Sequence, residues 1–231
     1  MNRKKIFLLF IFYFLTRLVL TYYTTFSISK DNSYEILTPI SVKSGEHDFY
    51  INPTKNLIEY GELKKDINNE YKPLGRMPSY GFVYGFFRLT LPHFYAINAL
   101  VLLQCFFEAL SVMLLLIIFH NKVKNIKYSY IFYTLLLFSY YVSYWNSFTN
   151  VESFSSSFLI IGIISYLYFN NTGKLLFLVI SSFFWAILCS FKPYILPIML
   201  ILLVHLIFKK NAIRIKLMYS FLFCFPITII H

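Results

Sequence analysis

Long runs of apolar residues alternate with short polar or basic connections along the chain. A helix needs about 20 mainly apolar residues to cross a bilayer. By this rule the sequence predicts membrane spans near residues 6–27, 94–119, 128–145, 153–169, 174–190, 193–208 and 217–231. We therefore predict an all-α polytopic membrane protein with about seven transmembrane helices, each as long as its apolar run.

The basic residues fall on alternate connections between these spans. They lie at the N-terminus, between the second and third spans, between the fourth and fifth, and between the sixth and seventh. Because cytoplasmic connections carry an excess of Lys and Arg, this side is predicted to be the cytoplasm. The N-terminus is then cytoplasmic, and the long loop 28–93 is extracytoplasmic.

The composition supports a membrane protein: 58% of the residues are hydrophobic and only 13% are charged. Soluble domains average about 45–50% apolar and about 25% charged residues. The net charge of +11 could suggest nucleic acid, but its cations stand in short clusters between apolar runs. We therefore expect membrane lipids, and no nucleic acid, as partners. The three cysteines lie inside apolar runs without paired spacing and are expected to be core residues.

The loop 28–93 collects most of the acidic residues of the chain. The ten Asp and Glu residues include Asp31, Glu35, Glu46, Asp48, Glu59, Glu62, Asp66 and Glu70 in this loop. Most of them balance basic neighbours and keep the loop solvated. The stretch after Pro53 predicts a short helix that ends at Gly61, with Leu57, Ile58 and Tyr60 on its apolar side. Residues 76–92, aromatic and flanked by arginines, predict a helix lying on the membrane surface.

Two charged residues lie inside predicted spans. Arg17 is deep in the first span and Glu108 is in the middle of the second. Charges in the membrane interior are costly and are usually paired. We expect these two either to pair directly or to find other polar partners within the bundle.

Several motifs of the outer connections resemble one family. The first loop carries Tyr-Ile-Asn-Pro at residues 50–53, Asn-Leu-Ile at 56–58, Gly61 and Arg-Met-Pro-Ser-Tyr-Gly at 76–81. Asn-Val-Glu-Ser follows at 150–153, and Lys-Pro at 192–193. In order and spacing these motifs resemble GT-C glycosyltransferases, and more narrowly the bacterial branch related to aminoarabinose transferases and protein O-mannosyltransferases.

The resemblance implies a polytopic enzyme of the cytoplasmic membrane with its active loop outside. Such an enzyme transfers a sugar from a polyprenyl-phosphate-linked donor to a lipid, glycan or protein acceptor. The family uses an acidic residue four positions before the aromatic residue matched by Tyr50, which is Glu46 here. The family usually has Asp at that position, and Asp48 stands two residues later, so both carboxylates are candidate catalytic residues. Tyr50, Tyr80 and Glu152 are expected to support them.

The implied chemistry needs a base and a cation. Inverting transfer needs a carboxylate that takes the acceptor's proton, and a cation must meet the departing phosphate. Arg76, Lys192 and Arg88 are the candidate phosphate-binding residues at the outer face. Arg76 and Lys192 could instead be lipid anchors, and Glu152 could simply favour a helix start. No cofactor is predicted. A divalent metal is chemically possible, but His47 has no second ligand at metal spacing and no metal ligand is assigned.

The chain is expected to form a single GT-C-like transmembrane domain over residues 1–231, with the active site in the loop 28–93. Relatives of this branch generally have more spans, so the domain is expected to be incomplete at its C-terminal end, and activity of this chain alone is in question. Two alternatives stay open. One is a multispan flippase or polymerase of lipid-linked saccharides, and the other is a non-catalytic membrane subunit.

Overall fold

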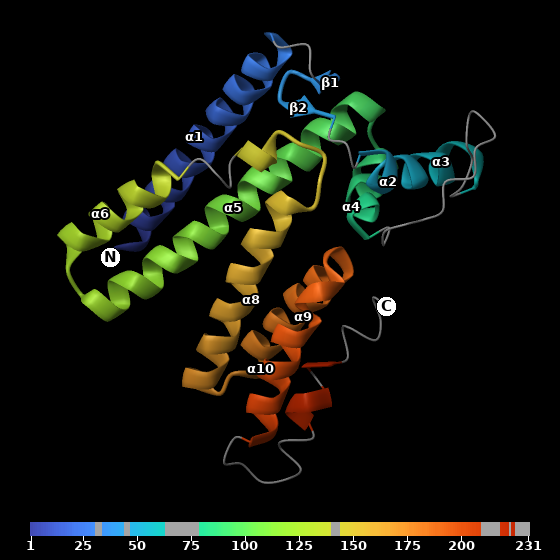
Figure 1. Cartoon of the computed structure of the whole chain (residues 1–231). Helices are drawn as coiled ribbons and strands as arrows, with labels where there is room; N and C mark the ends of the chain where they lie inside the picture. Colours follow the sequence, from blue (N-terminus) through green and yellow to red (C-terminus); the bar gives the residue numbers. More distant parts are fainter. Residues whose placement is uncertain are drawn as a thin grey trace. The chain divides into compact units, whose positions relative to one another are not determined.

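The computed structural model describes residues 1–30, 34–43, 47–62, 79–139, 144–208, 218–221 and 223–224, except for the side chain of Asp48 (Figure 1). The chain forms two compact units, Met1–Phe154 and Ser155–His231. Within these described residues, three helices are long and apolar enough to cross a membrane: Arg3–Lys30, His93–Val123 and Glu152–Thr172. They correspond to the predicted spans 6–27, 94–119 and 153–169.

The first unit is built around one long helix. Its elements are α1 (Arg3–Lys30), β1 (Ile36–Thr38), β2 (Ser41–Val42), α2 (His47–Tyr50), α3 (Asn52–Tyr60), α4 (Ser79–Arg88), α5 (His93–Val123), α6 (Ile126–Leu137) and the start of α8 (Glu152–Thr172). Helix α5 packs against α1, α4 and α6 and against both strands (Figure 1). The strands form a small antiparallel hairpin that the sequence did not predict.

Helix α1 is polar on its inner face and apolar on its outer face. Its buried residues are Tyr13, Arg17, Thr21, Thr24 and Thr25, which recur at helical spacing. Between Ile6 and Phe26, its exposed large side chains are all apolar or aromatic: Phe7, Leu8, Phe12, Leu15, Val19, Tyr22, Tyr23 and Phe26. A helix in water shows the opposite arrangement. This distribution is the one expected of a helix that faces lipid outside and a polar bundle inside.

Helix α6 corrects the third predicted span. A continuous helix over 128–145 was expected, but α6 ends at Leu137 and residues 138–139 are not helical. Its 12 residues rise about 18 Å, which is less than the roughly 30 Å of a bilayer core. The last turn is held by a side chain instead of by further helix: the Leu136 carbonyl accepts a hydrogen bond from Arg17 Nη2 at 2.7 Å. The same carbonyl also accepts from the Ser139 amide at 3.2 Å, so the end of α6 is bonded both to the residues that follow it and to α1.

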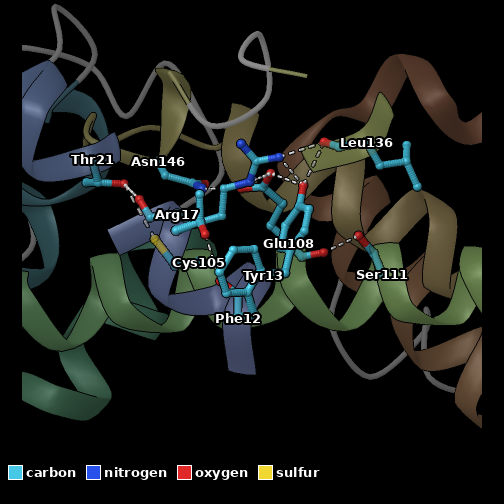
Figure 2. A network of polar contacts seen from close by, with 10 residues as sticks. Phe12, Tyr13, Arg17, Thr21, Cys105, Glu108, Ser111, Leu136 and Asn146 are labelled. Atoms are coloured by element: carbon cyan, nitrogen blue, oxygen red, sulfur yellow. Dashed lines mark hydrogen bonds and ion pairs between the residues drawn. The ribbon is translucent and has the colours of Figure 1, made fainter. Parts of the chain in front are cut away.

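The polar centre of the first unit is the ion pair between Arg17 and Glu108 (Figure 2). Both residues lie near the middle of their helices, and Arg17 Nε is 3.1 Å from Glu108 Oε1. Tyr13 also donates to Oε1, at 3.0 Å, and Asn146 Nδ2 donates to Oε2. The Arg17 side chain is 0% exposed and that of Glu108 3%. Of the two expectations for these charges, direct pairing is confirmed.

Two short helices of the outer loop pack closely through glycine. Helix α3 begins near Pro53 and ends at Gly61, whose φ of 75° is left-handed, as the sequence predicted. Leu57 and Tyr60 are exposed, whereas Thr54 is buried against α4. A Cβ added at Gly85 would stand 2.6 Å from Thr54 Cγ2, and one at Gly81 would collide with the Tyr50 carbonyl oxygen. The small residues of α4 therefore allow α3 to approach its backbone.

The second unit contains the rest of α8, then α9 (Leu175–Phe191), the 3-10 turn η1 (Pro193–Ile195) and α10 (Leu196–Phe208). Helices α8 and α9 meet where Gly162 faces Trp185, and Ser181 Oγ donates to the Gly162 carbonyl at 2.8 Å. Tyr166 joins α10 by a 2.5 Å hydrogen bond with His205 Nδ1. The predicted spans 174–190 and 193–208 correspond to shorter apolar helices. The predicted span 217–231 lies largely outside the described residues.

Candidate functional site

Segments that carry the sequence motifs come together at the end of the first unit where α2 and α4 lie. The rings of Tyr50, at the end of α2, and Tyr80, at the start of α4, lie edge to face with centroids 5.5 Å apart. The ring of Phe154 packs against the other side of Tyr80 at 5.8 Å. Tyr50 and Tyr80 are both buried. Three stretches separated by tens of residues thus share one aromatic core.

Gln104 of α5 ties two of these stretches together. Its Nε2 donates to the Tyr80 hydroxyl at 3.0 Å, to the Phe148 carbonyl at 3.5 Å and to the Asn150 carbonyl at 3.4 Å. Burial raises the pKa of Tyr80, although the hydrogen bond from Gln104 lowers it. Tyr80 therefore stays a neutral phenol at physiological pH and acts as a structural residue rather than as a base.

The segment before α8 is held like an extra strand. The Val42 amide donates to the Ser147 carbonyl at 2.7 Å, and the Thr149 amide donates to the Val42 carbonyl at 3.4 Å. The Asn150 side chain then accepts from the Glu152 amide at 3.2 Å, which caps the start of α8. Glu152 lies in the first turn of that helix, where the helix dipole favours a carboxylate.

Helix α2 carries the candidate carboxylates. Glu46 lies outside the described residues, and only the backbone of Asp48 is described. Their shared neighbour His47 is buried, and its Nδ1 forms a 2.7 Å hydrogen bond with Thr149 Oγ1. Since Tyr50 is buried as well, the backbone that bears both candidates is anchored at His47 and at Tyr50.

The three candidate phosphate-binding cations have different structural environments. Arg76 lies outside the described residues. Arg88 ends α4, and its Nη2 is 3.1 Å from Glu59 Oε1 while its Nη1 donates to the Leu91 carbonyl at 3.3 Å. Arg88 thus links α4 to α3. Lys192 belongs to the second unit, where its Nζ lies 5.7 Å from the ring centroid of Tyr194. Its participation in a phosphate site stays a prediction.

The structure adds residues that the sequence did not single out. Gln104 binds the segment before α8 at Asn150, Asn146 binds the same segment to Glu108, and His47 and Thr149 connect it to α2. Gln104 stands four residues before Glu108 in an otherwise apolar helix, so the two share one face. That spacing was a usable signal for a polar inner face of α5. Among the described residues, no group of three His, Cys, Asp or Glu side chains could hold a metal ion.

Comparisons with protein-family models, with curated proteins and with solved structures found no significant match. The class of the protein therefore follows from its own fold. The chain is a helical membrane protein, and the part that the structure describes has three helices of spanning length, with an elaborated loop between the first two.

Proposed function

We propose that the protein is a membrane glycosyltransferase of the GT-C type. It transfers a sugar, with inversion, from a polyprenyl-phosphate-linked donor to a lipid, glycan or protein acceptor at the outer face of the cytoplasmic membrane. One observation carries this proposal: the first loop and the segment before α8, which supply separate motifs of the resemblance, are packed together around Tyr80 and Gln104.

The arrangement suits base catalysis by a loop carboxylate. A general base must be held within hydrogen-bond reach of the acceptor in a productive orientation. Helix α2 is fixed through His47 and Tyr50, one on each side of Asp48 in the sequence. Glu46 directly precedes His47. In this proposal one of the two carboxylates takes the acceptor's proton as the C1–O bond to the phosphate breaks.

The phosphate of the leaving lipid needs cations at the membrane surface. Arg76 and Lys192 fill this role in the proposal, Arg76 as a bidentate group and Lys192 as a point charge. Arg88 is engaged by Glu59 and would have to exchange that partner to bind phosphate. The exposed aromatic side chains of α4, Phe82 and Phe86, suit a helix lying at the lipid interface where the donor would arrive.

Sugar transfer in isolated membranes tests the proposal. The full-length chain is expressed, and transfer from a radiolabelled polyprenyl-phosphate sugar is measured into lipid, glycan and protein fractions. Replacing the base carboxylate, by Glu46→Gln or Asp48→Asn, should lower transfer by about 10²- to 10⁴-fold. Matched controls are Glu35→Gln and Glu62→Gln, which remove exposed carboxylates of the same loop and should leave transfer unchanged.

The result also separates the alternatives. If the Glu46→Gln, Asp48→Asn double variant transfers as well as the unaltered chain, the assignment of the base is wrong. A chain that transfers no sugar but moves the labelled lipid between leaflets would be a flippase. A chain that does neither on its own, and is required by another membrane enzyme, would be a non-catalytic subunit.

A further inference from the structure

The buried ion pair and the outer site are joined by one segment of the chain. Residues 144–152 run from the polar centre of the first unit to the start of α8. At the inner end, Asn146 is fully buried and donates its side-chain amide to Glu108 Oε2. The other oxygen of Glu108 is held by Arg17 and Tyr13 from α1. Asn146 is therefore bound to a carboxylate whose own position is fixed by two helices.

The segment is held again one helical turn further along α5. Gln104, four residues before Glu108, donates to the carbonyls of Phe148 and Asn150. Both residues lie on the same face of one helix. Two side chains of α5 thus set the path of the segment, Glu108 at Asn146 and Gln104 between Phe148 and Asn150.

The outer end of the segment reaches the candidate catalytic residues. Thr149 is hydrogen-bonded to His47, the residue between Glu46 and Asp48. Asn150 caps α8 at Glu152. A displacement of the segment at Asn146 would therefore be transmitted over three residues to α2 and to the first turn of α8.

Stability alone does not account for charges in this place. Taking two charges out of water costs several kcal/mol per ion, and a well-packed apolar pair is often as stable. Hydrogen bonds are strong in a low-dielectric interior, so a buried polar network favours one arrangement of the groups that it joins. The arrangement selected here includes the path of the segment that ends at the outer site.

We infer that the Arg17–Glu108 pair positions the extracytoplasmic site through Asn146. Asn146 and Glu108 are positioning residues: both are buried, and they act on the site through the segment 147–152 and through Thr149 and His47. The catalytic part of this inference rests on the proposed glycosyl transfer. The geometric part, control of α2 by Asn146, stands independently of it.

A swap of the hydrogen-bonding groups tests the inference. Asn146→Asp places a carboxylate against the Glu108 carboxylate. It should lower kcat by about 10- to 100-fold and leave the KM for the donor within about threefold, because a misplaced catalytic group disturbs the reacting geometry more than it disturbs donor binding. Adding Glu108→Gln restores an amide-to-carboxylate bond with the same net charge beside Arg17, and should recover most of the lost rate. Ser111→Ala is the control, because Ser111 Oγ donates only to the Glu108 backbone carbonyl.

A second measurement does not depend on activity. Phe49, in α2, is 41% exposed, so the rate at which Phe49→Cys reacts with a maleimide reports the position of that helix. The background is Cys224→Ala, because Cys105 and Cys189 are buried. Asn146→Asp and Asn146→Ala should change this rate several-fold, and the swap should restore it. A cysteine at Leu89, 72% exposed on the far end of the α4 region, should react at an unchanged rate.

The outcomes separate the inference from the proposed function. If no variant transfers sugar but the Phe49→Cys rate responds to Asn146, the positioning stands and the proposed function fails. If transfer is present and neither kcat nor the labelling rate responds to Asn146→Ala, the positioning is wrong. Should Asn146→Asp not fold, a folded and active swap variant supports the coupling, and a swap as defective as Asn146→Asp overturns it.

Discussion

Removing one charge of the buried pair should destabilise the first unit more than removing both. In Glu108→Gln the guanidinium of Arg17, 0% exposed, loses its counter-charge. The new amide has a single oxygen, so it can no longer accept from Arg17 and Tyr13 on one side and from Asn146 on the other, as the carboxylate does. Breaking a buried ion pair from one side costs about 3–5 kcal/mol, and an arginine at the centre of a membrane helix costs about 2.5–3.5 kcal/mol on insertion scales. Because both figures describe the same stranded charge, we expect about 3–5 kcal/mol in total.

The double variant Arg17→Gln, Glu108→Gln removes both charges and keeps groups that can bond Tyr13, Asn146 and the Leu136 carbonyl. It should be more stable than Glu108→Gln, which gives a coupling energy of about 2–3 kcal/mol between the two positions. The control is Glu59→Gln, which breaks the Arg88–Glu59 pair, whose side chains are 25% and 26% exposed. A pair that is partly solvated should cost no more than about 1 kcal/mol.

The assay is denaturant-induced unfolding in detergent micelles, followed by tryptophan fluorescence. All variants carry Trp185→Phe, so that Trp145, which adjoins Asn146 in the sequence, is the fluorophore and reports on the first unit. Equal destabilisation by Glu108→Gln and by Glu59→Gln would refute the reasoning, because it would mean that the Arg17 charge is not stranded. The reasoning would also be refuted if the double variant Arg17→Gln, Glu108→Gln lost as much free energy of unfolding as Arg17→Gln and Glu108→Gln lose together.

Three further predictions follow from other parts of the first unit. Gly81→Ala should lower the thermal midpoint and separate α2 and α3 from α4, because the added Cβ would collide with the backbone carbonyl of Tyr50 in α2 and with Thr54 Oγ1 in α3; an unchanged midpoint would contradict this packing. Burial raises the pKa of Tyr84 to about 12, although nearby Arg88 lowers it. The folded state therefore holds the phenol proton above the ordinary pKa of 10.0, so Tyr84 contributes stability that is lost as the pH rises from about 10 to about 12. Unfolding measured against pH should show a smaller alkaline loss in Tyr84→Phe, and equal losses would refute the shift. A cysteine at Glu152 should react with an impermeant maleimide on intact cells and one at Lys124 should not; the reverse pattern would invert the predicted orientation.

The apolar pattern predicted the long helices closely because their length is a property of composition. The runs at 6–27, 94–119 and 153–169 lie within α1, α5 and α8, and each helix extends a few residues into its polar flanks. The pattern failed at 128–145 for a physical reason. Aromatic side chains made this run look continuous, but its helix ends where the Leu136 carbonyl accepts from Arg17. A hydropathy pattern contains no information about a backbone carbonyl that accepts a hydrogen bond from a side chain of another helix.

The site was only partly accessible to sequence reasoning. The motifs located the two segments, and the turn at Gly61 followed from the left-handed conformation that glycine allows. The contacts between the segments could not be predicted, because they depend on how residues 144–151 fold back onto β2 and α5. Gln104 illustrates this: its position on one face with Glu108 was visible, but its acceptors are two backbone carbonyls.

The polar residues of the membrane helices and the acidic outer loop belong to one structure. An inner face of α5 that offers Gln104 and Glu108 can bind a non-helical segment at the depth where a helix would otherwise be required, since backbone groups there must be satisfied within the protein. Arg17 of α1 and Glu108 of α5 bond polar groups on both sides of the end of α6, at the Leu136 carbonyl and at the Asn146 side chain. The same bonds fix the residues that anchor α2 and start α8. A substitution that made α5 uniformly apolar would be expected to favour a longer third helix and to release the outer segment.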